Sequence, residues 1–185
     1  IEKLTMFHAP EIFRQRQQSG LLDKNAWLFV NSIASVCLAG EDLEEMRRRV
    51  NGIGRNVVVE ITEEEDLDLE MLHAKRNAKI LSGLYALDIA LDPDFIKVDI
   101  SIIRGIDSDP NKQEIMRNIV SYAHQRGMQI VAEGVETAEE LRTSRALGAD
   151  LFQGYFLSRP GAVPSMIAPA AKDILREFPY TVSDK

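Results

Sequence analysis

The stretch QIVAEGVETAEELRTSRALGADLFQGYF, residues 129–156, has the pattern of a strand, a helix and a second strand in succession. Its first residues, Gln129–Ala132, and its last, Leu151–Phe156, are runs of strand length that are rich in apolar side chains. Between them, Thr137 and Glu140 form a capping box that begins a helix, and a glycine follows the end of that helix. Two strands joined by a helical crossover are expected to run parallel in one sheet.

The same alternation of apolar runs and helical stretches extends upstream of residue 129. Strands are predicted over Trp27–Asn31, Val57–Ile61, Tyr85–Ala90 and Phe95–Ile100. Helices are predicted over 11–18, opened by Pro10, and over 42–50, 67–81, 111–125 and 163–177. Most of the strand candidates are nearly continuous apolar runs, which are typical of parallel strands covered on both faces. The sequence therefore predicts an α/β fold with a parallel sheet, either open or closed as a barrel.

Composition narrows the class of protein. The chain has 185 residues, of which 45% are hydrophobic and 28% are charged, as in an ordinary globular domain. Its net charge of −7 argues against binding to a DNA or RNA polymer. No stretch is long and apolar enough to cross a membrane. A single cysteine, Cys37, excludes an internal disulfide, so we expect a reducing, cytoplasmic compartment.

Polar residues collect where the predicted strands end, which is where parallel α/β folds bind their ligands. They are Asn31, Glu60, Glu63, Asp88, Lys97, Asp99, Glu133, Glu136 and Gln153. Carboxylates gathered from several strands repel one another unless a cation neutralises them, and Mg²⁺ and Mn²⁺ prefer such oxygen-rich sites. Lys97 and Asp99 are two residues apart on one predicted strand, so we expect them to face the same side. We therefore predict a divalent-metal site that acts on a phosphate ester.

Simpler interpretations stand beside this one. A single acid at a strand end is as often a helix cap or a salt-bridge partner, so the hypothesis depends on the collective pattern. His8, His73 and His124 have no metal-ligand spacing, and we interpret them as structural or surface residues.

At this point the sequence resembles a known family, the EAL domains. The similarity runs from about Pro10 to Pro160 and is carried by six segments in order. These are FVNS (Phe29–Ser32), VEITE (Val59–Glu63), FIKVD (Phe95–Asp99), VAEGVET (Val131–Thr137), LGAD (Leu147–Asp150) and QGYFLSRP (Gln153–Pro160).

The resemblance implies a modified triosephosphate-isomerase-type (β/α) barrel over residues 1–185 that hydrolyses cyclic di-GMP to pGpG with Mg²⁺ or Mn²⁺, two ions in all. It implies metal ligands at Asn31, Glu60 and Asp88, a metal-site acid or general base at Glu133, and a water-holding Lys97. Asp99 and Gln153 would support the metal site, Glu63 would brace a loop, and Glu136 and Arg159 would lie at the rim of the substrate pocket. Attached sensory or GGDEF-type domains and a homodimer are further expectations from the family.

The sequence also departs from the family pattern. The Glu-Ala-Leu strand that names the family is not found, a segment of the DDFG type is missing after Asp88, and the chain is shorter than the family between Lys24 and Asn25. Either the chain is a degenerate member, or this sequence joins stretches that are separate in the full protein. We favour the second, because removing a helix and a strand-to-helix loop should prevent a barrel from closing.

The sequence is therefore compatible with three functions. The leading one is a cyclic di-GMP phosphodiesterase. The second is a catalytically silent domain that binds cyclic di-GMP or a partner protein and transmits a signal. The third is a barrel enzyme that acts on another phosphate ester. The chain retains most of the residues expected at the metal site and at the attacking water, and this favours the phosphodiesterase.

Overall fold

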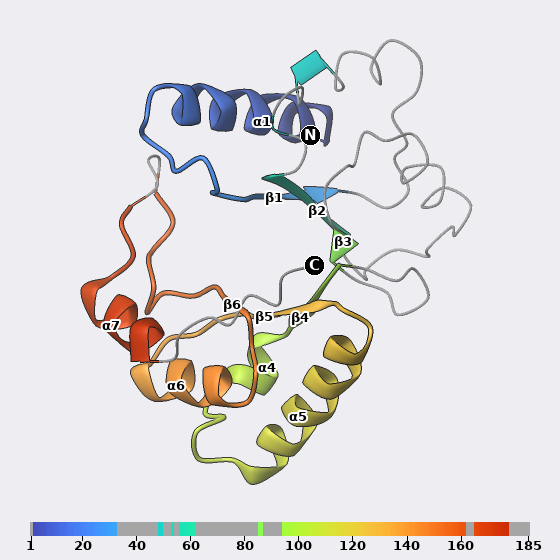
Figure 1. The fold of residues 1–185 in the computed structure, drawn as a ribbon, viewed down its shortest axis with the longest axis vertical. Helices are drawn as coiled ribbons and strands as arrows, with labels where there is room; N and C mark the ends of the chain where they lie inside the picture. The colour runs from blue at the N-terminus through green and yellow to red at the C-terminus, as the bar shows by residue number, and fades with distance from the viewer. Residues whose placement is uncertain are drawn as a thin grey trace. The chain divides into compact units, whose positions relative to one another are not determined.

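The structure, a computed structural model, describes residues 2–32, 48–49, 53, 56–61, 85–86, 94–161 and 165–177. The chain divides into two compact units, Ile1–Pro93 and Asp94–Lys185, whose elements are labelled in Figure 1. Each unit combines parallel strands with helices, which confirms the predicted α/β class. Within the described residues no closed barrel is seen, so closure stays a prediction.

The first unit holds three parallel strands in the order β1, β2, β3. Their bounds are Leu28–Ser32, Val57–Ile61 and Tyr85–Ala86. The prediction for β2 is confirmed at both ends, and β1 begins and ends one residue later than predicted. Beyond residue 86 the third predicted strand lies outside the described residues. So does the helix predicted over 67–81, and of the one predicted over 42–50 only the helical residues 48 and 49 are described.

The helix α1 (Glu2–Gln18) is longer than predicted. Pro10 was expected to open a helix, but it lies inside α1 and its side chain is fully buried. An internal proline removes one backbone hydrogen bond and costs about 3 kcal/mol in a helix. Phe13, three residues further along the same helical face, is also buried. We infer that burial of this apolar face offsets the cost of the proline.

Lys24 and Asn25 lie in a tight turn between α1 and β1. The Asp23 carboxylate accepts a hydrogen bond from the Asn25 backbone N–H at 2.7 Å. The Gln17 side-chain amide donates to the Asp23 and Lys24 carbonyls at 3.1 and 3.2 Å. Asn56, the residue before β2, donates from its side-chain amide to the carbonyls of Lys24 and Ala26 at 3.2 and 2.9 Å. The carbonyls of Asp23, Lys24 and Ala26 thus all accept hydrogen bonds at this turn.

The second unit also holds three parallel strands, in the order β4, β5, β6. The strand bounds are Phe95–Val98, Gln129–Ala132 and Leu151–Phe152. The helix bounds are Ile100–Ile103 for α4, Pro110–Gln125 for α5, Ala138–Ala146 for α6 and Pro169–Glu177 for α7. In Figure 1, α4, α5 and α6 lie on one side of these strands. No helix in the described part of the chain is long and apolar enough to cross a membrane.

One continuous core joins these helices to the strands. Fully buried side chains come from every layer, among them Ile103, Met116, Ile130, Leu141 and Ala171. Burial of such a side chain contributes about 1.5–3 kcal/mol, so this core dominates the stability of the unit.

Local signals in the sequence correctly predicted several boundaries of the second unit. The limits of β5 and the capping box of Thr137 and Glu140 are confirmed, and Gly148 follows α6 with a φ of 103°. Three other predictions were wrong. The strand predicted over Phe95–Ile100 ends at Val98, because Asp99 caps α4. The strand predicted over Leu151–Phe156 ends at Phe152, and the last helix begins at Pro169 rather than at residue 163.

Candidate functional site

A close ion pair lies where β4 and β5 end. These strands are parallel neighbours in which Lys97 pairs with Val131, so the residues that follow them emerge at the same edge. The Glu133 backbone N–H donates to the Val98 carbonyl at 3.0 Å, one step beyond the ladder. Its carboxylate meets Lys97 Nζ at 2.5 Å, and only 12% of the Lys97 side chain and 27% of the Glu133 side chain are exposed. A half-buried cation and carboxylate in contact could together hold and deprotonate a water molecule.

The loop after β6 is joined to the loop after β5 through their backbones. Gln153 N–H donates to the Ala132 carbonyl at 2.9 Å, and the Gln153 carbonyl accepts from Val135 N–H at 3.0 Å. Phe156 N–H then donates to the Val135 carbonyl at 3.1 Å. Gln153, which was predicted to support the site, therefore lies at the same end of the strands as Glu133.

Two glycines make this close packing possible. Gly134, directly after Glu133, has a φ of +70°, and a Cβ there would lie 2.3 Å from Ile100 Cγ1. A Cβ on Gly154 would lie 2.1 Å from the Val135 carbonyl oxygen. Gly154 is thus needed where the backbones of the two loops approach each other, and Gly134 is needed where the Ile100 side chain packs against the loop after β5.

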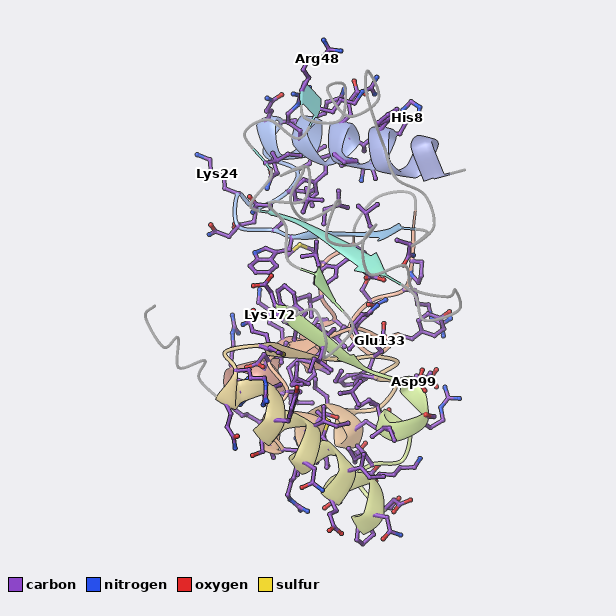
Figure 2. All side chains as sticks on the ribbon, turned by 90° about the vertical axis from the view of Figure 1, so that its right-hand side faces the viewer. His8, Lys24, Arg48, Asp99, Glu133 and Lys172 are labelled. Atoms are coloured by element: carbon purple, nitrogen blue, oxygen red, sulfur yellow. The ribbon has the colours of Figure 1, made fainter. Side chains whose placement is uncertain are left out.

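Asp99 has a different position from the one predicted. It was expected on the strand, two residues beyond Lys97 and facing the same side, but β4 ends before it and Asp99 becomes the N-cap of α4. Its carboxylate accepts the Ser101 backbone N–H at 2.8 Å. Hydrogen bonds from Ser101, first from its side chain and then from its backbone, lower the pKa of Asp99 below its ordinary value. Asp99 and Glu133 directly follow the neighbouring strands β4 and β5, and Figure 2 labels both residues.

The two residues predicted at the rim of the pocket each have a partner of their own. The Glu136 carboxylate meets Arg104 Nη2 at 2.6 Å, and both side chains are exposed. The guanidinium of Arg159 lies 4.8 Å from the ring centre of Tyr155, an exposed aromatic residue. The ion pair thus connects the segments that follow β4 and β5, and the cation–π pair lies in the loop that follows β6.

The first unit presents two of the predicted metal ligands. Asn31 on β1 and Glu60 on β2 are directly paired in the parallel register, so both side chains emerge on one face. An amide oxygen beside a carboxylate suits a hard divalent cation, so this donor pair fits the predicted metal. Glu63 and Asp88 lie outside the described residues. Across the described ranges, no cluster of three or more His, Cys, Asp or Glu side chains could hold a metal ion.

Sequence reasoning missed the environment of Glu140. Its place in a capping box was predicted, yet the structure also buries this residue to 4% exposure and gives it a partner far away in the sequence, the Gly105 N–H at 2.9 Å. No local pattern signals such a bond. His124 contacts Asp150 at 2.9 Å, which agrees with a structural role, and His73 lies outside the described residues.

Comparisons with known proteins agree on one family. A family model described as the EAL domain matches residues 12–160. The cyclic di-GMP phosphodiesterase PdeL of Escherichia coli is 31% identical over an alignment of 157 residues, and the match covers 76% of this chain and 43% of PdeL. The signaling protein YkoW of Bacillus subtilis is 33% identical over an alignment of 120 residues, and the match covers 55% of this chain and 14% of YkoW. The chain thus spans less than half the length of these curated relatives.

Solved structures give the same answer for the fold. BlrP1 of Klebsiella pneumoniae, in a complex with manganese and cyclic di-GMP, matches with a TM-score of 0.72 and 26% identity. The match covers 86% of this chain and 45% of that one. A standalone EAL protein of Vibrio cholerae, in its c-di-GMP-bound form, matches with a TM-score of 0.73 at 24% identity, over 92% of this chain and 78% of its own.

Proposed function

This chain belongs to the EAL-domain family, and from that premise we propose that it is the phosphodiesterase domain of a cyclic di-GMP signalling protein. The proposed reaction adds water across one phosphodiester of cyclic di-GMP and yields linear pGpG. Relatives named as cyclic di-GMP phosphodiesterases support the substrate. The observation that carries the chemistry is the half-buried contact of 2.5 Å between Lys97 and Glu133 at the strand ends.

In the proposed mechanism, Lys97 and Glu133 contact each other directly and both bind the attacking water beside their ion pair. The water oxygen forms a bond to phosphorus while its proton passes to the Glu133 carboxylate. The opposite P–O3′ bond breaks, and the departing oxygen takes up a proton from solvent water to become the 3′ hydroxyl. Glu133 then releases the proton it gained to solvent, so that one water is consumed in all. The Lys97 ammonium stabilises the negative charge that develops on the phosphoryl oxygens. A positioned acid–base group of this kind contributes roughly 10²–10⁴-fold to a rate.

The proposed metal ligands are Asn31 and Glu60, together with Asp88. Mg²⁺ or Mn²⁺, when bound, would lower the pKa of the water and neutralise phosphate charge. We propose two ions, with Asp99 and Gln153 supporting the site, Glu63 bracing its loop, and Glu136 and Arg159 at the rim. The fit rests on the register that pairs Asn31 with Glu60. The complexes of BlrP1 with manganese and with calcium support the use of a divalent cation in the family.

We also propose that residues 1–185 form one barrel domain of a longer protein, with sensory or GGDEF-type partners and a second copy of the chain. The chain covers only a small part of the length of its curated relatives, and this supports the proposal of attached sensory or GGDEF-type domains.

The test is hydrolysis of cyclic di-GMP in the presence of Mn²⁺, followed by separation of substrate from pGpG. Glu133→Gln keeps the size of the side chain but removes its charge, so we expect turnover to fall by roughly 10²–10⁴-fold. Glu139→Gln is the matched control, because Glu139 is an exposed acid in the first turn of α6. Equal turnover by Glu133→Gln and wild type would refute the role of Glu133. Binding of cyclic di-GMP by a wild type that cannot hydrolyse it would instead identify a receptor.

A further inference from the structure

A buried acid that no step of the proposed reaction uses lies in the first turn of α6. Glu140 is 4% exposed, and its two carboxylate oxygens accept three backbone hydrogen bonds. Oε1 accepts Gly105 N–H at 2.9 Å, while Oε2 accepts Glu136 N–H at 2.8 Å and Thr137 N–H at 3.1 Å. We call this group of four residues the Glu140 clamp. The bonds to Oε2 are sufficient for the helix cap, whereas the bond to Gly105 connects the cap to a different loop.

The Glu140 clamp fastens two loops to each other. Gly105 lies in the turn after α4, and Glu136 and Thr137 end the loop of residues 133–137 between β5 and α6. A second link on the surface joins the same loops, since Arg104 pairs with Glu136 at 2.6 Å. Burial raises the pKa of Glu140, but the three backbone N–H groups and Arg104 outweigh burial, so its pKa is lowered overall. The carboxylate is therefore charged and fully engaged near neutral pH.

Residues 133–137 are held at three points along their length. Glu133 N–H is bonded to Val98 at the first, Val135 is bonded to Gln153 at the second, and the Glu140 clamp holds the third. Glu133, which meets Lys97, is the first residue of this loop. The third point is the one that depends on side chains, and the Glu140 carboxylate accepts three of its hydrogen bonds.

We propose that Glu140 is a positioning residue, which holds the loop of residues 133–137 so that Glu133 stays against Lys97. This inference rests on the proposed function for its effect on catalysis, but the anchoring itself can be measured without activity. Displacements of about 1 Å at a reacting group can cost on the order of 10²-fold in rate. Because the loop keeps its other two anchors, a smaller loss is expected here.

The decisive variant is Glu140→Gln, compared with Glu139→Gln. Glutamine has one carbonyl oxygen, so it can keep the bonds to Glu136 and Thr137, but its NH₂ group then faces the Gly105 N–H, a donor against a donor. Glu139 is the neighbouring acid of the same helical turn and is exposed, so its variant makes the same chemical change without touching the clamp.

Three measurements are made on each protein: kcat and KM for cyclic di-GMP with Mn²⁺, amide hydrogen exchange, and acetylation of Lys97 relative to the exposed Lys172. Figure 2 labels Lys172, and the helix that carries it is α7. For Glu140→Gln we expect kcat to fall about 10-fold with KM changed less than about 3-fold, and Lys97 acetylation to rise about 3-fold over Lys172. Glu139→Gln should match wild type in all three.

The outcomes separate the two proposals. A wild type without turnover, combined with faster Lys97 acetylation in Glu140→Gln, refutes the phosphodiesterase and supports the anchoring. An active wild type, with Glu140→Gln unchanged in kcat and in acetylation, overturns the positioning role and leaves the phosphodiesterase intact. If Glu140→Gln fails to fold, amide hydrogen exchange in the wild type tests whether the Glu140 clamp exists. Amides of Gly105, Glu136 and Thr137 that exchange as fast as unprotected loop amides would overturn the clamp.

Discussion

Replacement of Gly154 by alanine tests how the two loops of the second unit are packed. A Cβ at this position would lie 2.1 Å from the Val135 carbonyl oxygen and 2.3 Å from the Val135 nitrogen. Both are backbone atoms, so no side-chain rotation can relieve the overlap. Heavy atoms in contact prefer roughly 3.5 Å, so the two loops must separate by about 1 Å or more.

The cost follows from the hydrogen bonds that such a shift would break. Val135 N–H to the Gln153 carbonyl at 3.0 Å and Phe156 N–H to the Val135 carbonyl at 3.1 Å both cross this contact. Each lost bond costs about 0.5–1.5 kcal/mol, and more where a buried group is left unpaired. Overpacking adds about 1–3 kcal/mol, so we expect Gly154→Ala to lower the free energy of unfolding by about 3 kcal/mol.

Thermal unfolding followed by circular dichroism measures this effect, and we expect the Tm to fall by about 6–12 °C. Gly105→Ala is the control in the same unit. Gly105 has a φ of +70°, but an added Cβ would meet no atom closer than Ser108 Oγ at 4.0 Å. Only backbone strain of about 1 kcal/mol applies there, which corresponds to a fall of about 2–4 °C. A Gly154→Ala protein no less stable than Gly105→Ala would falsify the steric argument.

Three further predictions concern the second unit. The pKa of Glu140 is lowered from its ordinary value of 4.5, so this carboxylate stabilises the fold above pH 4.5 and the stabilisation is lost as the pH falls below that value. The free energy of urea unfolding of Glu140→Gln should therefore depend less on pH in this acid range than that of the wild type. Asp150→Ala removes the acceptor of the Ile130 N–H at 2.8 Å and should cost about 1–3 kcal/mol in urea unfolding, whereas an unchanged midpoint would contradict this. Ser144→Ala should leave the free energy of unfolding unchanged or raise it by up to about 1 kcal/mol, because the buried Ser144 hydroxyl has no hydrogen-bond partner. A loss above about 1 kcal/mol would show that this hydroxyl has a hydrogen-bond partner in solution.

Much of the candidate site could be predicted from the sequence because its residues lie in the last part of a strand or directly after it. Lys97 and Glu133 were each predicted at a strand end, and parallel neighbouring strands bring such positions together. Asp99 was misplaced, since an aspartate after an apolar run can either continue a strand or cap a helix, and only the path of the chain decides which. The end of β6 was missed for a related reason, because the apolar residues after Phe152 pack in a turn beside Val135 rather than in a strand.

The stretch of residues 129–156 shows where sequence stops and tertiary structure begins. By itself it determined a strand, a capped helix and a parallel return, since apolar periodicity and capping act over a few residues. Only the tertiary structure gave Glu140 the Gly105 N–H, a partner 35 residues away, and set the Gly154 backbone against Val135. Buried polar groups need hydrogen-bond partners, and these partners come from whichever segments the fold places beside them. A short sequence pattern does not contain the position of such distant segments.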